Sequence, residues 1–287
     1  MGWHEELVFT ETSEEGAGLS GLLTEADRAV GPAVIYIHGF PIDAFLPFSS
    51  AIARGLASRG YTTLQANTRG AGVAHQIYCR DGPSMLGGGW LELFSESPRD
   101  IDVWITFMES RGISRVVLLG VSFGGLKTVY YLTERADPRV AGAIVAQAPM
   151  PGADRINSAE RPDPERVALA RRLVAEGREL DFLWRQYGDP SGAVSARTYL
   201  DRVRIGMDFF GIYTPDPRIA RVRCPLFLCY GGDDAGIANA DDVAVAARNA
   251  KGSPRVDVRI VEHAVHAFIG REDEAAAIFA DWIRTLG

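Results

Sequence analysis

Two hydrophobic patterns alternate along the chain: short runs of consecutive apolar residues, and longer stretches in which apolar residues recur every three or four positions. The short runs predict strands, and the central runs are continuously apolar, as expected for strands that are covered on both faces of a sheet. The predicted strands are residues 5–10, 17–24, 33–38, 62–67, 115–121, 141–146, 225–230 and 256–261.

The stretches between these runs have the helical period. Residues 99–110 predict a helix, with Ser97 as the cap, Pro98 in the first turn, and apolar residues on one stripe. Further helices are expected at about 46–59, 123–135, 238–250 and 272–285. Alternating strands and helices predict the α/β class, with a mostly parallel eight-stranded sheet and helices on both faces.

Residues 151–217 interrupt this alternation. They contain proline and charge clusters, no good strand pattern, and helical patterns at roughly 163–176, 178–187 and 195–209. A structureless loop of that length is rare. We therefore expect a helical cap at 151–217 above the carboxyl edge of the sheet, and a core domain made of residues 1–150 and 218–287.

Composition narrows the partners that the protein can have. The net charge of −7 argues against a nucleic-acid-binding surface, which needs a basic face. No apolar run approaches the roughly 18 residues that would indicate a membrane span. The acidic N-terminus lacks the features of a secretion signal, and the three cysteines are expected to be free thiols, so we expect a cytoplasmic protein, monomeric or homodimeric.

The segment "GVSFG" at 120–124 has the pattern Gly-x-Ser-x-Gly between a predicted strand and a predicted helix. A very tight strand-to-helix turn needs small residues two positions before and after the serine. Such a turn exposes the serine oxygen at the N-terminus of a helix, where developing negative charge is favoured. Ser122 is therefore the candidate nucleophile.

A serine hydroxyl needs a base that accepts its proton, and the base needs a group that orients it. His266 lies in the loop that follows the last predicted strand, and its position favours it over His263. Asp234 follows the strand at 225–230, and the adjacent Asp233 is the alternative. The order serine, aspartate, histidine is the one expected for this architecture.

Two backbone amides are candidates for stabilising an oxyanion. The segment "HGFP" at 38–41 follows a predicted strand, and its glycine lets the backbone turn toward the serine. The amides of Phe40 and Phe123 form the expected pair, and His38 is expected to brace the turn. No group of residues has metal-ligand spacing, so we expect no metal and no cofactor.

The segments "YIHGF", "GVSFGG", "YGGDD" and "HAF" occur in an order and spacing that resemble those of the α/β-hydrolase superfamily over nearly the whole chain. The resemblance implies the α/β-hydrolase fold and an esterase-like serine hydrolase that acts on a small-molecule carboxylic ester through an acyl-enzyme. Amide, thioester, lactone or carbon–carbon cleavage on the same three residues stays open, as does a non-catalytic protein that only binds a ligand.

Aromatic residues of the expected cap are candidates for the substrate pocket, because ligands in open α/β sheets bind at the carboxyl edge. They favour a substrate of small to medium size that is partly hydrophobic, and we expect Phe209→Ala or Phe210→Ala to change the ranking of substrates. The candidates are Trp184, Tyr187, Phe209, Phe210 and Tyr213.

Overall fold

An eight-stranded sheet forms the centre of the computed structural model, which describes residues 2–150, 162–184, 193–234 and 236–287. The strand order is β1-β2-β4-β3-β7-β8-β11-β12. β2 pairs antiparallel with β1 and with β4, and every pairing from β4 onward is parallel. The predicted fold class and all eight predicted strands are therefore confirmed. Their bounds are β1 Trp3–Glu11, β2 Gly18–Ala26, β3 Ala33–Ile37, β4 Thr63–Ala66, β7 Val116–Val121, β8 Val140–Ala146, β11 Leu226–Gly231 and β12 Val256–Val261.

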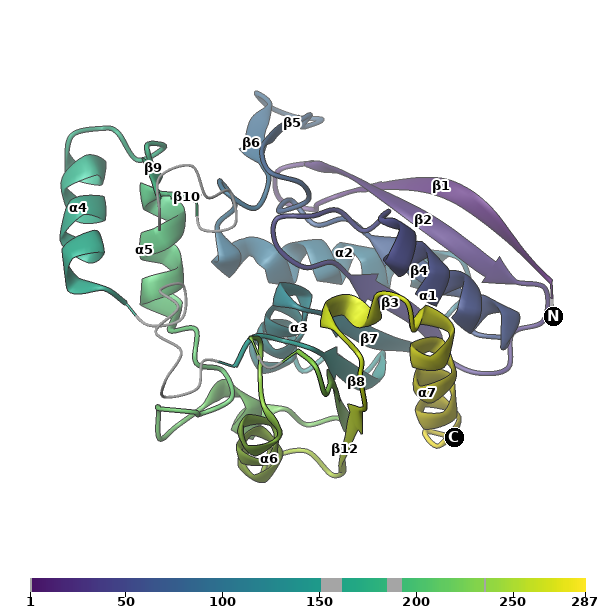
Figure 1. Cartoon of the computed structure of the whole chain (residues 1–287). Coiled ribbons are helices and arrows are strands. Elements are labelled where there is room, and N and C mark those ends of the chain that lie inside the picture. Colours follow the sequence, from purple (N-terminus) through teal and green to yellow (C-terminus); the bar gives the residue numbers. More distant parts are fainter. Residues whose placement is uncertain (1, 151–161, 185–192, 235) are drawn as a thin grey trace.

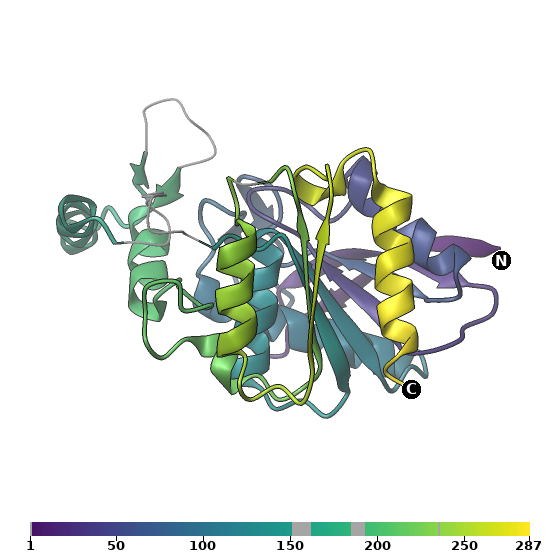
Figure 2. The ribbon, with the colours of Figure 1, turned by 60° about the horizontal axis from the view of Figure 1, so that its bottom comes forward.

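Helices cover both faces of the sheet (Figures 1 and 2). α1 (Pro47–Ser58) and α7 (Glu272–Arg284) pack on one face. α2 (Ser97–Ser110), α3 (Phe123–Glu134) and α6 (Ala240–Asn249) cover the other face. Each layer has its own cluster of buried apolar side chains, because the continuously apolar strands present such residues to both sides.

One detail of α2 corrects the prediction. Ser97 is the first helical residue and not the cap, and the preceding Glu96 makes no side-chain capping bond. A single 3-10 turn at Phe94–Glu96 leads directly into α2, so the helix starts two residues before the predicted 99–110.

The expected cap region contributes α4 (Pro164–Ala175), α5 (Ala196–Ile205) and a small antiparallel pair, β9 (Phe182–Leu183) with β10 (Val194–Ser195). These elements lie to one side of the sheet (Figure 1). The prediction of a helix at 178–187 is wrong for residues 178–184, where Phe182 and Leu183 instead pair with β10. Residues 185–187 lie outside the described residues. A second short antiparallel pair, β5 (His75–Ile77) with β6 (Met85–Gly87), precedes α2 in the chain. It was not predicted.

Helix α5 is anchored to the core by hydrogen bonds to one segment, residues 89–95. The Ser195 amide donates to the Trp90 carbonyl at 2.7 Å, and the Ser95 amide donates to the Asp201 carboxylate at 2.9 Å. The Arg202 guanidinium donates to the Gly89 carbonyl at 3.3 Å. These three bonds, one between backbone groups and two that use the Asp201 and Arg202 side chains, hold α5 against residues 89–95.

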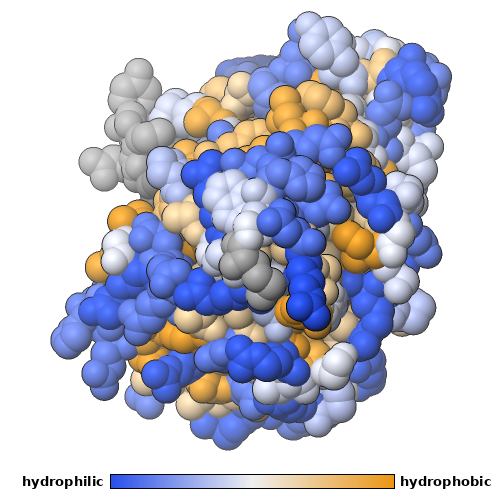
Figure 3. All heavy atoms as spheres, turned by 90° about the vertical axis from the view of Figure 1, so that its right-hand side faces the viewer, coloured by the Kyte–Doolittle hydropathy of each residue, from blue (hydrophilic) through white to orange (hydrophobic). Residues whose placement is uncertain are grey.

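Hydrophilic residues predominate on the face that Figure 3 presents, and apolar areas there are separated from one another. In the part of the chain that the structure describes, no helix is long and apolar enough to cross a membrane.

Candidate active site

Ser122 lies at the sharp turn between β7 and α3. Its backbone has φ 55° and ψ −128°, a conformation that residues with a side chain rarely adopt and that persists only where the surroundings enforce it. A Cβ atom at Gly124 would collide with the Ile37 carbonyl, and one at Gly120 would collide with the Gly124 carbonyl. The two glycines of the motif therefore allow the turn to fit against β3 and α3.

Ser122, His266 and Asp234 come from three separate segments and form one chain of hydrogen bonds. Ser122 Oγ lies 3.0 Å from His266 Nε2, and Asp234 Oδ2 lies 2.7 Å from His266 Nδ1. The Asp234 side chain is only 10% exposed, so its bond to His266 is shielded from water. In this geometry Asp234 can hold a proton on Nδ1, which leaves Nε2 free to accept the serine proton.

The two alternative residues pair with each other at the surface. His263 Nδ1 lies 3.6 Å from Asp233 Oδ2, and both side chains are exposed. The geometry therefore separates an inner pair, Asp234 and His266, from an outer pair at the surface.

Contacts between neighbouring loops hold His266 in place. The Gln147 side-chain amide donates to the Val265 carbonyl at 2.8 Å, and the Asp233 amide donates to the Ala264 carbonyl at 3.1 Å. Behind His266, the buried Phe268 ring packs against Phe279 of α7 with centroids 5.7 Å apart. The histidine loop is therefore tied both to the end of β8 and to the turn that carries Asp234.

The two expected oxyanion donors lie on either side of Ser122. A Cβ atom on Gly39 would stand 3.3 Å from Ser122 Oγ, so the Gly39–Phe40 segment runs directly beside the nucleophile. In the described part of the chain, the Phe40 amide donates to no other group. Phe123 is the first residue of α3, where the amide has no preceding turn to accept its hydrogen bond. The Phe40 and Phe123 rings touch, with centroids 5.7 Å apart.

A cationic side chain of α5 lies over these two rings. The Arg202 guanidinium carbon is 4.5 Å from the Phe123 centroid and 4.8 Å from the Phe40 centroid, and the residue is only 4% exposed. Cation–π contacts of this kind are stronger when the cation is removed from water. The contact joins the expected cap to the segments that carry the candidate oxyanion amides.

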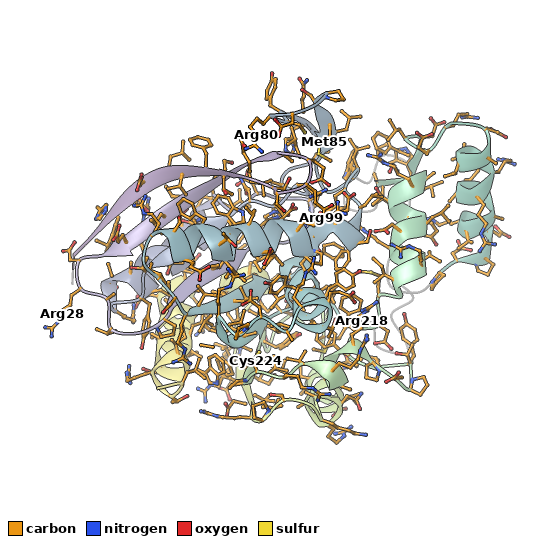
Figure 4. All side chains as sticks on the ribbon, turned by 180° about the vertical axis from the view of Figure 1, so that it is seen from behind. Arg28, Arg80, Met85, Arg99, Arg218 and Cys224 are labelled. Atoms are coloured by element: carbon orange, nitrogen blue, oxygen red, sulfur yellow. The ribbon has the colours of Figure 1, made fainter. Side chains whose placement is uncertain are left out.

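The expected pocket residues occupy different environments. Phe209 and Phe210 are completely buried, and Phe209 packs against Phe94 and Tyr130 in the main core. Arg218, labelled in Figure 4, covers this cluster, with its guanidinium 4.7 Å from the Tyr130 centroid. No part of either phenylalanine ring reaches accessible space, so a substrate could sense these rings only through their neighbours.

Trp184 and Tyr213 retain exposed surface, and Tyr187 lies outside the described residues. Trp184 belongs to a cluster of three rings with Trp90 and Phe182, in which Trp90 stands edge-on to both partners at 5.2–5.5 Å. Trp90 was not predicted as a pocket residue. It follows Gly89, where a Cβ atom would come within 2.8 Å of the Phe40 ring.

Sequence reasoning also missed a buried ion pair beneath the site, Lys127 with Glu92. Only 1% of either side chain is exposed. One signal was present: Lys127 lies within an almost uninterrupted apolar stretch of α3 in a chain that has only one other lysine, Lys251. Among the described residues, no group of three or more histidine, cysteine, aspartate or glutamate side chains is arranged to hold a metal ion.

The comparisons with known proteins agree with this fold. The family model described as "Alpha/beta hydrolase family" matches residues 34–281. A search of the curated proteins finds no match to this sequence.

Solved structures with a similar fold include several esterases. The alpha/beta hydrolase GrgF from Penicillium sp. sh18 is 18% identical, with 98% of each chain covered and a TM-score of 0.71. Est1E from Butyrivibrio proteoclasticus with bound ferulic acid is 13% identical, with 97% of this chain and 98% of that one covered and a TM-score of 0.67. The Pyrococcus furiosus esterase Pf2001 is 15% identical, with 99% and 94% covered and a TM-score of 0.62.

Proposed function

The chain belongs to the alpha/beta hydrolase family, and on that premise we propose that it is a serine hydrolase that cleaves a carboxylic ester through an acyl-enzyme. The observation that carries this proposal is the hydrogen-bonded chain from Ser122 Oγ through His266 to Asp234, at 3.0 Å and 2.7 Å. A ligand-binding protein that had lost turnover would have no use for this arrangement at a strained turn.

In the proposed reaction, Ser122 Oγ attacks the ester carbonyl carbon while His266 Nε2 takes the serine proton. The negative charge that develops on the carbonyl oxygen is stabilised by the amides of Phe40 and Phe123, each contributing on the order of 3 kcal/mol. His266 then gives its proton to the leaving alcohol. A water molecule, deprotonated by the same nitrogen, attacks the acyl carbonyl, and His266 returns the proton to Ser122 Oγ as the acid leaves. Asp234 keeps the ring proton on Nδ1 and stabilises the imidazolium that forms in each step.

For the substrate, we propose a small to medium ester with a partly hydrophobic acyl or alcohol group. The partly exposed rings of Phe182 and Trp184, together with Trp90, support this choice, because they offer an apolar surface where the cap region meets the core. The neighbour Est1E was solved with ferulic acid, an aromatic acid, so an aryl ester belongs in any substrate test.

A substrate panel on the purified protein tests the proposal. The acyl and alcohol groups of the esters are varied independently, and matched amides, thioesters and lactones are included. We expect esters to give the highest kcat/KM, with Ser122→Ala inactive on all of them. A panel on which every ester is inert, or on which Ser122→Ala equals the wild type, would refute the proposed function.

A further inference from the structure

The Lys127–Glu92 pair connects α3 to the segment that precedes α2, and a hydrogen bond from Lys127 to Thr68 leads on toward the loop that carries Phe40. Lys127 Nζ lies 2.8 Å from Glu92 Oε2 and donates a second hydrogen bond, at 2.9 Å, to Thr68 Oγ1. A Cβ atom at Gly70 would collide with the Glu92 carboxylate, so glycine at that position admits the acid into the core. Three segments that are distant in sequence therefore meet at one buried ammonium group.

The ammonium group sets the direction of the next hydrogen bond. An ammonium can only donate, so Thr68 Oγ1 accepts from Lys127 and has its own hydrogen available for His38 Nε2, which lies 2.9 Å away. The Thr68 amide donates to the same nitrogen at 3.2 Å. Both donors require Nε2 of His38 to be an acceptor.

His38 passes this constraint to the backbone. Complete burial, with the nearby Lys127 charge, lowers the pKa of His38 to about 3, so the ring is neutral at physiological pH. With Nε2 accepting, the ring proton is on Nδ1, which donates to the Gly39 carbonyl at 2.8 Å. In a trans peptide the carbonyl and the following N–H point in opposite directions. Fixing the Gly39 carbonyl toward His38 therefore fixes the Phe40 N–H away from it.

We infer that Lys127, Glu92 and Thr68 are positioning residues that hold the Phe40 amide in the direction needed to stabilise the oxyanion. The inference rests on the proposed function and goes beyond it, since none of the three residues touches the reacting atoms. A buried ion pair is weak evidence for a stabilising role, because an apolar pair of similar volume is often as stable. A role in orienting a hydrogen-bonded network gives a reason for its presence.

The matched substitutions Thr68→Val and Thr68→Ser test this inference. Both keep a small side chain at a buried position, and only serine keeps the hydroxyl that joins Lys127 to His38. Lys127→Met with Glu92→Gln removes both charges together, so that neither is left unpaired. Tyr131→Phe is the control, because it removes the hydroxyl of a buried tyrosine of α3 that donates to Asp137 and lies outside this network.

The measurements are kcat per titrated serine, KM, and the affinity for an arylboronic acid, which forms a transition-state-like adduct with a reactive serine. We expect Thr68→Val and the double variant to lower kcat by on the order of tenfold to hundredfold, with KM nearly unchanged and boronate affinity reduced by a similar factor. Thr68→Ser and Tyr131→Phe should stay close to the wild type.

Wild-type kcat per titrated serine and wild-type boronate affinity in Thr68→Val and in the double variant would overturn the inference, even if both variants melt at lower temperature. Equal losses of kcat in Thr68→Val and Tyr131→Phe would also overturn it. A wild-type protein that does not react with a fluorophosphonate and does not cleave any ester would refute the proposed function instead, and the inference would fall with it.

Discussion

Replacing Asp234 by asparagine removes one charge from the hydrogen-bonded chain that ends at Ser122. The carboxylate lies 2.7 Å from His266 Nδ1 and is nearly buried, so its bond is charge-assisted and shielded from solvent. It can only accept, which keeps the ring proton on Nδ1. An asparagine amide can donate to Nδ1 and so move the ring proton to Nε2, where the ring can no longer accept the serine proton.

A misplaced proton of this kind lowers kcat by about 10³–10⁴, on the order of 4–5.5 kcal/mol in the activation free energy. The assay is the initial rate of p-nitrophenyl acetate hydrolysis per folded protein, with thermal melting to verify the fold. Asp233→Asn is the matched control, because its carboxylate is exposed and lies 3.6 Å from His263, and we expect it to keep nearly the wild-type rate. The reasoning fails if Asp234→Asn retains more than about a tenth of the wild-type rate, or if Asp233→Asn loses more than Asp234→Asn does.

Three further predictions concern the surroundings of the nucleophile. Gly39→Ala would place a Cβ atom 2.9 Å from Ser122 Cβ, and we expect fluorophosphonate labelling to slow by about 100-fold; labelling at the wild-type rate would contradict this. Phe209→Ala should lower the free energy of unfolding by about 3–5 kcal/mol in urea, with equal rate losses for acetate and longer esters, because the ring is fully buried; a changed preference among esters would instead support the original expectation that this ring influences specificity. Because the pKa of His38 is lowered to about 3 in the folded state, its neutral form contributes stability that is complete above pH 6.5 and is lost as the pH falls toward 3. Between pH 8 and 5 the loss is about 2 kcal/mol. The free energy of unfolding of the wild type, measured in urea, should therefore fall by that much more than that of His38→Gln, and parallel pH dependences for the two proteins would refute this.

The sheet could be predicted because its strands are marked by local sequence. β3, β7, β8 and β11 are nearly continuous apolar runs, and such runs have few other ways to be buried. The turn at Ser122 was equally visible, since the steric demands of one tight turn require small residues at positions 120 and 124. Choosing His266 and Asp234 needed only their positions after the last two strands, and the structure places both within hydrogen-bonding distance of one another.

The features that escaped prediction depend on contacts between distant segments. Phe182 and Leu183 form a strand only because they pair with Val194 and Ser195, which lie farther along the chain. The burial of Lys127 depends on Glu92, which lies 35 residues earlier and is seen as its partner only once the chain is folded. The full burial of Phe209 likewise depends on Phe94 and Tyr130. The sequence alone therefore did not distinguish aromatic residues that line a pocket from those that pack in the core.

Reaction with a fluorophosphonate, followed by intact-protein mass and peptide mapping, is the most direct test of Ser122 as an activated nucleophile. We expect the wild type to gain one adduct, on the peptide that contains Ser122. Ser122→Ala should gain none, and His266→Ala should react far more slowly while remaining folded. A wild-type protein that gains no adduct, or an adduct that persists in Ser122→Ala, would contradict the central claim.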